Sequence, residues 1–233
     1  MNRMKDYLKI NILIFVLVVL SCSCLGQNSD TLSVNQQVDE VVESMLKNGK
    51  ACLMNNEWEM ARKHFNEVLE KTPGNLTALF FRAFADEKLG KFNFARADYE
   101  QILKVVPTHF ETRLCLLLLN QRDSHLTEAF DQANQLVALY PDSASVYFAR
   151  AGVEKEMEML ELAEGDYVKA LDIDKNNNNY LLALMETRLY MAKFDLAYAD
   201  LELLTKRGVA RKSLQNYFDM CSKRIVPKKQ KRE

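Results

Sequence analysis

The sequence contains few of the residues that build catalytic sites. Among its 233 residues are only seven glycines and three histidines, and it has no Gly-rich phosphate-binding loop, no HExxH pair and no GxSxG turn. The histidines, His64, His109 and His125, do not cluster in the sequence. Acidic residues are common on any charged helical surface, so they do not identify a general acid and base. We therefore expect a protein that is not an enzyme and that needs no metal or cofactor.

The chain also has almost no net charge. Its 31 Lys and Arg residues balance 32 Asp and Glu residues, which leaves a formal net charge of −1. Such a chain has no overall field that would attract nucleic acid, so any electrostatic partner must meet a local patch. Basic residues gather in a tail at 226–233. We interpret this tail as a disordered, solvated segment, and contact with anionic lipid is the alternative.

Cysteine is scarce and has no CxxC spacing. Of five cysteines, Cys22 and Cys24 stand near the N-terminus, while Cys52, Cys115 and Cys221 fall in separate predicted helices. If the N-terminal segment is removed, an odd number remains, which cannot all pair within one chain. We expect these three to be small buried hydrophobic residues, which is how free cysteine usually packs.

The first 26 residues have the organisation of an export signal. Three basic residues, Arg3, Lys5 and Lys9, precede an apolar run from Ile12 to Leu20, and small and polar residues follow up to Gly26. The run is shorter than the ~20 apolar residues that a membrane-spanning helix needs. Cleavage after Gly26 is the favoured interpretation, with an uncleaved anchor as the second choice.

A lipoprotein signal is another alternative. Cys22 follows Val19, Leu20 and Ser21, which partly resembles the lipobox whose cysteine is acylated. We rank acylation of Cys22 below simple cleavage because Leu20 is bulky where that box prefers a small residue. Either process would export the chain to the periplasm or cell envelope of a bacterium. Residues 27–36 are polar and aperiodic, so we interpret them as a linker between the signal and the fold.

The rest of the sequence is organised by five alanines at one constant interval: Ala61, Ala95, Ala129, Ala163 and Ala197. A fixed period of roughly 34 residues indicates a stack of similar units. Large apolar residues stand three positions before each alanine: Trp58, Phe92, Leu126, Leu160 and Phe194. Four positions after each come Phe65, Tyr99, Ala133, Tyr167 and Leu201. One helix face is therefore repeated five times. Pro73, Pro107 and Pro141 close the first three copies, because the residue before proline disfavours the α conformation.

This pattern resembles the tetratricopeptide repeat family, whose unit is a pair of helices with a small residue where they pack closest. The second copy matches best, with Leu79, Arg82-Ala83, Leu89-Gly90, Phe92, Ala95, Tyr99, Ile102-Leu103 and Pro107. Copy three lacks the usual aromatic at Ala133, and Lys175 and Val209 replace the closing proline in copies four and five. The resemblance implies an all-α fold, an α-solenoid of about five helix-turn-helix repeats over residues 37–209.

A capping helix is expected after the last repeat, at residues 210–225. Apolar residues there share one helical stripe: Leu214, Tyr217, Phe218, Cys221 and Ile225. A stack needs such a cap, because its last helix pair would otherwise expose a core face. At the other end, a helical pattern begins at Val38.

Copies two and four share a pair of charges that the other copies lack. Arg82 and Asp98 in copy two correspond to Arg150 and Asp166 in copy four. In the hairpin geometry of the family these positions face each other, so we predict an ion pair within each of the two repeats. A charged hook for a ligand is the less favoured alternative.

In members of the family, the first helix of each pair lines a concave groove that binds another protein. The resemblance places the ligand-facing positions at mostly apolar residues: Leu46, Lys50, Phe80, Phe84, Leu114, Leu118, Phe148, Leu182 and Glu186. Such a groove would suit the apolar face of a helix or an extended apolar segment. The alternative, held equally, is that these side chains pack against neighbouring helices or that the terminal helix fills the groove.

Chaperone-binding members of the family instead hold a terminal carboxylate with a clamp of Lys, Asn and Arg. Here the equivalent places carry Leu46, Lys50, Phe81, Glu111 and Cys115. We therefore expect that acidic peptide tails do not bind.

The favoured function is a non-catalytic scaffold or adaptor in the bacterial cell envelope, whose partner is another protein or peptide and not nucleic acid. The alternative is a structural or regulatory subunit of an envelope enzyme or secretion complex. In that case the stack would be a spacer, and its specificity would lie in the tail or the outer face.

Overall fold

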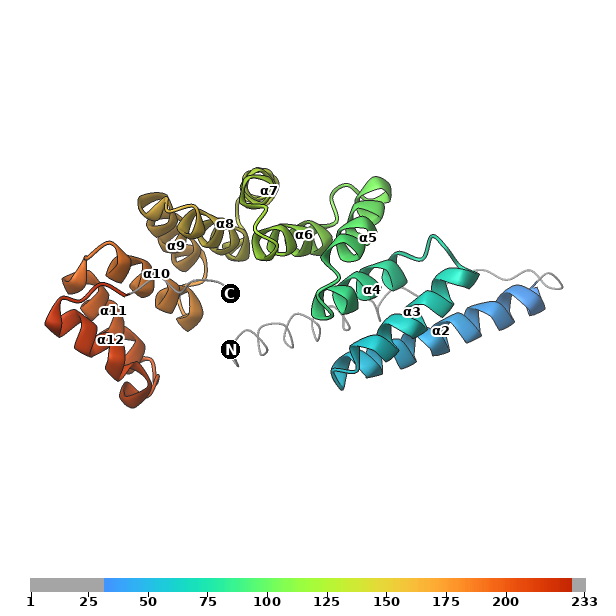
Figure 1. Ribbon diagram of the computed structural model, residues 1–233, viewed down its shortest axis with the longest axis horizontal. Helices are drawn as coiled ribbons and strands as arrows, with labels where there is room; N and C mark the ends of the chain where they lie inside the picture. The colour runs from blue at the N-terminus through green and yellow to red at the C-terminus, as the bar shows by residue number, and fades with distance from the viewer. Residues whose placement is uncertain (1–31, 228–233) are drawn as a thin grey trace. The chain divides into compact units, whose positions relative to one another are not determined.

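The computed structural model describes residues 32–227, with side chains from Asp39 onward. These residues form eleven α-helices and no strand (Figure 1). The helices are α2 (Leu32–Met54), α3 (Trp58–Lys71), α4 (Leu76–Lys88), α5 (Phe92–Val105), α6 (Phe110–Arg122), α7 (Leu126–Leu139), α8 (Ala144–Glu156), α9 (Leu160–Ile173), α10 (Asn178–Tyr190), α11 (Phe194–Lys206) and α12 (Arg211–Lys223). The predicted signal at 1–26, the lipidation candidate Cys22 and tail residues 228–233 lie outside the described residues.

Helix α2 begins at Leu32, and this start corrects part of the linker that we predicted at 27–36. No glycine or proline interrupts the stretch, and Val34, Val38 and Val42 continue the helical spacing toward the N-terminus. The first part of α2 belongs to a unit that ends at Ser44. The remainder of α2 and all later helices belong to a second unit, residues 45–233, which carries the repeats.

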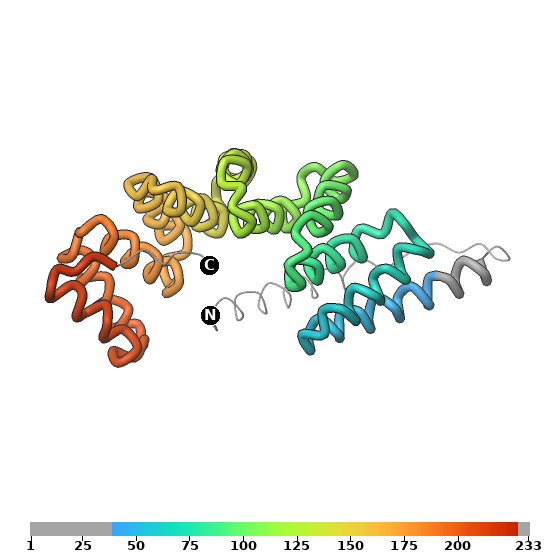
Figure 2. Tube along the Cα trace, viewed as in Figure 1, coloured from blue at the N-terminus to red at the C-terminus, as the bar shows by residue number. Residues whose placement is uncertain are grey.

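Within the second unit, helices that follow one another along the chain pack against one another. These contacts run from α3 on α4 to α11 on α12, and α6 also contacts α8. The second helices of the pairs are α3, α5, α7, α9 and α11, and their first residues are separated by the same interval as the repeated alanines. Figure 2 follows this order by colour. The predicted all-α solenoid of helix pairs with a terminal helix is confirmed.

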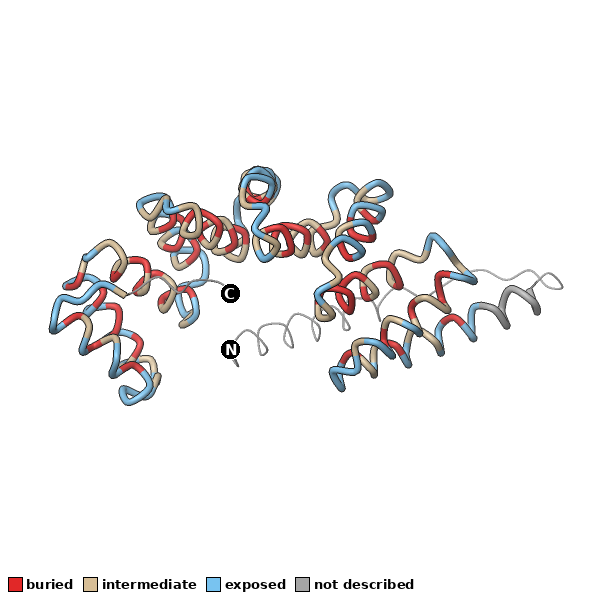
Figure 3. The backbone as a smooth tube through the Cα atoms, viewed as in Figure 1, coloured by how far each residue is buried: buried red, intermediate tan, exposed pale blue. Residues whose placement is uncertain are grey.

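The five repeated alanines all lie in the core. Each of Ala61, Ala95, Ala129, Ala163 and Ala197 is 0% exposed. A methyl group at this position lets the helices approach closely, because a larger side chain would not fit between packed backbones. Figure 3 shows that the buried segments recur from helix to helix and are not gathered in one central core. Each pair of helices therefore depends on its neighbours for burial.

The turn inside each helix pair is also repeated. One residue per turn has a left-handed backbone: Asn56, Gly90, Ser124, Glu158 and Ala192. In each turn the next amide donates a hydrogen bond to the carbonyl five residues earlier, as from Lys91 to Asp86 at 2.8 Å and from Lys193 to Arg188 at 2.8 Å. This is the Schellman arrangement that ends an α-helix. Gly90 is the single glycine among these five turn residues.

The turn between repeats keeps its form where the closing proline is missing. Thr72, before Pro73, has φ −135° and ψ 79°, and Asp174, before Lys175, has φ −118° and ψ 80°. After both turns an asparagine caps the next first helix: Asn75 accepts a hydrogen bond from the Ala78 amide at 2.9 Å, and Asn177 accepts one from the Tyr180 amide at 3.4 Å. The same backbone bend is therefore made without the proline.

Helix α12 is the last helix of the described residues. Leu214, Phe218 and Cys221 are buried in a cluster with residues of α10 and α11. Tyr217 packs on the same cluster. The helix ends at Lys223, and Ile225, which we expected on the same stripe, is exposed. Arg224 adopts the left-handed conformation and turns the chain away before Ile225 can reach the core.

Candidate partner-binding surface

Five of the predicted groove residues occupy one repeat position. Leu46 on α2 is the first, and the other four lie on later first helices. They are Phe80 on α4, Leu114 on α6, Phe148 on α8 and Leu182 on α10, and each is partly buried. The ring of Phe80 lies 5.8 Å from that of Tyr99 and 6.2 Å from that of His109. Leu114 packs on the cluster of α6, α7 and α8, and Leu182 packs on the cluster of α10, α11 and α12. Each side chain is therefore in contact with the protein on one side.

Phe148 lies against two aromatic rings of the neighbouring helices. Its ring stacks on Tyr180 with centroids 4.7 Å apart and tilts against Tyr167 at 5.5 Å. These three rings join α8, α9 and α10. Such contacts stabilise the stack of helices by about 0.5–1.5 kcal/mol per ring pair beyond their buried area.

The remaining predicted groove residues are held by neighbours in different ways. Phe84 is buried, with its ring edge-on to Trp58 at 6.2 Å. Leu46 is partly buried, as is Leu118, which packs on the α6–α8 cluster. Lys50 places its ammonium 5.2 Å from the centre of the Phe81 ring. None of the nine residues is fully exposed, and their role in binding stays a prediction.

Glu186 takes part in a contact that the sequence did not indicate. It accepts hydrogen bonds from the Tyr217 hydroxyl at 2.7 Å and from Lys155 at 3.3 Å. The carboxylate thus joins α8, α10 and the terminal helix α12. We interpret Glu186 as a structural residue of this end of the chain as well as a candidate contact for a partner.

The positions of the carboxylate clamp do not form a basic site. Phe81 is buried, and the thiol of Cys115 lies among Tyr99 and Glu87, where burial raises its pKa far above the ordinary range. Glu111 would repel a carboxylate. The expectation that acidic peptide tails do not bind remains a prediction.

The predicted ion pair between Arg82 and Asp98 is confirmed. Arg82 donates two hydrogen bonds to the Asp98 carboxylate, both at 2.7 Å, and a third to Asn66 at 2.8 Å. One guanidinium therefore joins α3, α4 and α5. Hydrogen bonding to Asp98 raises the pKa of Arg82 further, so the charge of Arg82 is permanent.

The same arrangement recurs two repeats later. Arg150 donates hydrogen bonds to both oxygens of Asp166 and to Asn134 at 3.1 Å. The participation of Asn66 and Asn134, each 16 residues before its arginine, was not predicted. The sequence signal that could have revealed it is the equal spacing of Asn, Arg and Asp in the two copies.

A second set of polar contacts joins the second helices α3, α5 and α9 to the first helix of the next pair, and we call such a boundary between pairs a joint. The partners are 24 residues apart in the sequence. Arg62 donates to Asp86 at 2.6 Å, Arg96 donates to Asn120 at 3.0 Å, and Arg188 donates to Glu164 at 2.8 Å. In the last of these joints the second helix carries the acidic residue and the first helix carries the arginine, the reverse of the first joint. The contact is therefore present although the residue types differ.

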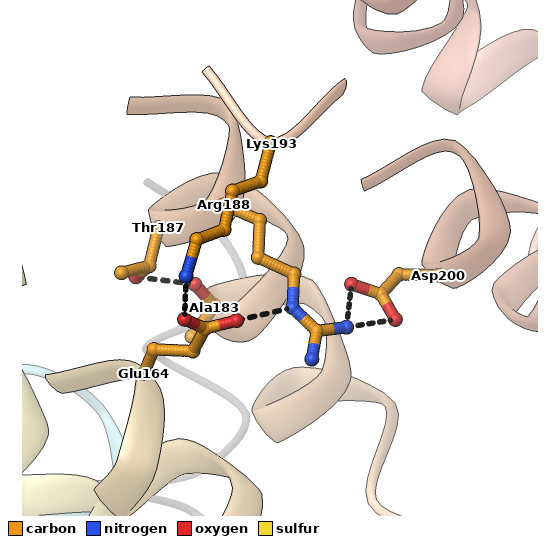
Figure 4. Close-up of polar contacts among 6 residues, drawn as sticks. All are labelled: Glu164, Ala183, Thr187, Arg188, Lys193 and Asp200. Carbon is orange, nitrogen blue, oxygen red and sulfur yellow. Dashed lines mark hydrogen bonds and ion pairs between the residues drawn. The ribbon is translucent and has the colours of Figure 1, made fainter. Parts of the chain in front are cut away.

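Figure 4 shows the last of these joints. Arg188 lies between Glu164 of α9 and Asp200 of α11, and it bonds to both Asp200 oxygens at 2.8 and 2.9 Å. Lys193 also pairs with Glu164. Burial alone would raise the pKa of Glu164, but hydrogen bonds from Lys193 and Arg188 outweigh it and lower the pKa. This joint therefore holds two balanced pairs of charges.

The joint between α7 and α8 lacks the corresponding partner. Glu154 stands where the other joints have Asp86, Asn120 and Arg188, but the equivalent position on the preceding helix is Phe130. Glu154 is 3% exposed, and its Oε2 atom is buried without a hydrogen-bond partner. Burial first, and then the Asp166 carboxylate, raise the pKa of Glu154 to about 7.

Within residues 32–227, no group of three or more His, Cys, Asp or Glu side chains is arranged to hold a metal ion. The search for a membrane span covered the same residues, and none of their helices combines the length and apolarity that crossing a bilayer requires.

Solved structures with a similar fold are tetratricopeptide repeat proteins. A tetratricopeptide repeat protein from Parabacteroides merdae matches with TM-score 0.66 and 18% identity, over 78% of this chain and 75% of that one. A thermophilic TPR protein from Thermus thermophilus matches with TM-score 0.59 and 17% identity, over 80% and 100% of the two chains. YrrB, a TPR protein with an unusual peptide-binding site, matches with TM-score 0.56 and 14% identity, over 73% and 92%. No protein-family model and no curated protein matches the sequence.

Proposed function

We propose that this chain, which has the tetratricopeptide repeat fold, is a non-catalytic adaptor of the bacterial cell envelope. It would bind a helix or an extended apolar segment of another protein along its first helices. The observation that carries the proposal is the row Phe80, Leu114, Phe148 and Leu182, one large apolar side chain at one position in each of four successive repeats, each partly exposed. A partner segment that covered this row would bury apolar surface in every repeat that it crossed. The peptide-binding site named for YrrB, which has a similar fold, supports this use of the fold.

A capture experiment with two matched variants tests the proposal. The mature chain, immobilised as bait, is incubated with envelope extract of the bacterium that encodes it, and the retained protein is identified by mass spectrometry. We expect Phe80→Ala with Phe148→Ala to lose this protein while the melting temperature stays above the assay temperature. Unfolding of that variant would instead identify the row as core, and undiminished capture by a folded variant would refute the proposed surface.

The control variant removes apolar side chains from the other helices of the pairs. Phe94 on α5 is 61% exposed and Leu162 on α9 is 56% exposed. Phe94→Ala with Leu162→Ala changes similar side chains, so it shows whether capture depends on the first helices or on apolar surface in general. Under the adaptor proposal this control keeps the partner.

A specific observation favours the spacer function as second candidate. Exposed apolar residues recur at one position of the second helices, at Met60, Phe94, Leu162 and Leu196, and only Glu128 breaks this series. Exposed apolar side chains in a regular row are a common feature of protein contacts. If the control variant loses the partner and the Phe80 and Phe148 variant keeps it, the outer-face function is supported instead.

Export is proposed from residues 1–26 of the sequence. Fractionation of cells that carry a C-terminally tagged chain should place the protein in the envelope fraction. Mass spectrometry should find a mature N-terminus at Gln27, and Cys22→Ala should leave that product unchanged. A product that starts at an acylated Cys22 would establish the lipoprotein alternative, and a full-length cytoplasmic product would refute export.

A further inference from the structure

The joint between the third and fourth repeats has one negative charge more than its positive charges can balance. In the joint of α3, α4 and α5, Arg62 pairs with Asp86 and Arg82 pairs with Asp98. In the joint of α9, α10 and α11, Arg188 and Lys193 balance Glu164 and Asp200. Both sets of charges sum to zero.

In the joint of α7, α8 and α9, one cation serves two carboxyl groups. Arg150 already bonds to both oxygens of Asp166 and to Asn134. Its nearest approach to Glu154 is 3.7 Å, from Nε to Oε1, which is too long for a hydrogen bond. The other oxygen of Glu154 is buried without a hydrogen-bond partner.

The groups that face Glu154 come from three helices. Helix α9 presents Asp166, whose carboxylate would repel an ionised Glu154, and the buried Tyr167. On helix α7, Phe130 holds the repeat position that pairs with this one in the other joints, and Asn134 accepts a hydrogen bond from Arg150. Helix α8 itself supplies Arg150. Helix α6 contacts α8 through the hydrogen bond from Gln121 to Glu156, which lies two residues after Glu154 and on another face of the helix.

We propose that this joint is a pH-sensitive element: Glu154 is protonated when α7, α8 and α9 are packed, and its ionisation loosens their contact. A protonated carboxyl leaves the joint with one cation and one anion, as in the balanced joints. When the proton passes to water, a buried carboxylate remains beside Asp166 without a donor, and burying an unpaired charge is costly. The carboxylate can regain hydration only if the helices move apart.

The direction of the pH effect follows from proton binding in the folded and unfolded states. An exposed glutamate ionises near pH 4.3, whereas Glu154 in the packed joint ionises at about 7. The packed form therefore binds more protons between these values, so its stability falls as the pH rises through this window. Below it, both forms are protonated and the effect is absent.

Hydrogen exchange tests the proposal on the whole mature chain. Amide exchange is compared between wild type and Glu154→Gln at pH 5 and at pH 8, each variant against the wild type at the same pH. At pH 8 we expect the wild type to exchange the amides of α8 and the adjoining parts of α7 and α9 at least about tenfold faster than the variant, and the ratio to be clearly smaller at pH 5, near the lower end of the window. Equal exchange at both pH values would overturn the proposal. Acceleration spread evenly over all helices would also overturn it, because the effect would then not lie in this joint.

Two further variants make the result specific. Phe130→Arg restores the residue type that Arg62 and Arg96 provide in the first two joints, so it should remove the difference between pH 5 and pH 8 while Glu154 is still present. Glu100→Gln changes an exposed glutamate of α5 and should behave as the wild type does. If Glu154→Gln does not fold, the carboxyl-carbon NMR signal of Glu154 in the wild type decides the matter. Titration near pH 7 supports the proposal, and titration below pH 5 overturns it.

Discussion

Leu117 and Ala133 are both fully buried in one apolar cluster of the third repeat, where the second repeat has Ala83 and Tyr99 at the same positions. The large side chain has moved from the second helix to the first. The first and fourth repeats keep the order of the second, with Gly49 opposite Phe65 and Ala151 opposite Tyr167, so a small residue on the first helix makes room for a large one on the second. The fifth repeat has two side chains of similar size, Met185 and Leu201. The missing aromatic at Ala133 is therefore compensated within its own repeat.

This exchange predicts that the two residues are coupled. Ala133→Tyr alone should overfill the cluster and cost about 1–3 kcal/mol of unfolding free energy. Leu117→Ala alone should leave a cavity and cost about 2–5 kcal/mol. The double variant copies the second repeat, so it should be more stable than the sum of the two costs implies. Urea unfolding of the four proteins measures this difference, and additive costs would show that the two sites do not share space.

Two glycines in helices should respond oppositely to the same substitution. A Cβ atom at Gly49 would lie 2.7 Å from the ring of Phe65, whereas at Gly165 nothing lies within 4 Å. Gly49→Ala should therefore lose about 1–3 kcal/mol by overpacking. Gly165→Ala in the middle of α9 should gain about 0.5–1 kcal/mol from helix propensity. Thermal melts of both variants check this, and a stabilised Gly49→Ala would mean that the ring can move aside.

The buried ion pair of Asp98 should contribute more than an exposed pair. Asp98→Ala leaves the Arg82 guanidinium with Asn66 as its remaining hydrogen-bond partner, and Asp98 is buried. We expect a loss of about 1–3 kcal/mol. The matched control is Asp195→Ala, because Asp195 and Arg224 are paired at 3.5 Å with 91% and 67% of their side chains exposed. That loss should stay within about 0.5 kcal/mol. Partner capture should survive both substitutions, and its loss in folded Asp98→Ala would show that the pair serves binding.

The repeat architecture could be predicted from the sequence because its signal is carried by residue size. An alanine at a constant interval and an apolar face around it indicate helix pairs whatever the surface residues are. The pairing of Arg82 with Asp98 could be predicted because the two positions face each other across the helix pair in the geometry of the family. The start of α2 was placed late because polar residues between Val34 and Val38 resemble a linker, although none of them breaks a helix.

The joints between repeats could not be predicted in the same way. Arg62 with Asp86 and Glu164 with Arg188 have opposite charge order, so no single motif describes them. Glu154 resembles an ordinary surface glutamate until the structure shows that it is buried and that Phe130 replaces its partner. The candidate binding row was predicted from the repeat positions that face a ligand in the family, but the sequence does not show how much of each side chain is buried by neighbouring residues. That depends on neighbours such as Tyr180 beside Phe148, which the fold brings together.

The turns inside the helix pairs offer a last prediction, because four of five left-handed positions carry a side chain. Ala192 has φ 56° and Ser124 has φ 62°, and in this left-handed region the Cβ atom lies too close to the following carbonyl oxygen. Glycine removes this strain but gains entropy in the unfolded chain, so the net gain should be about 0.5–1 kcal/mol. Ala192→Gly should accordingly raise the melting temperature by about 1–4 °C. Gly90→Ala, at φ 72°, is the reverse control and should lower it by a similar amount. If Ala192→Gly instead lowered the melting temperature, the stability of this turn would depend on contacts of the methyl group and not on backbone strain.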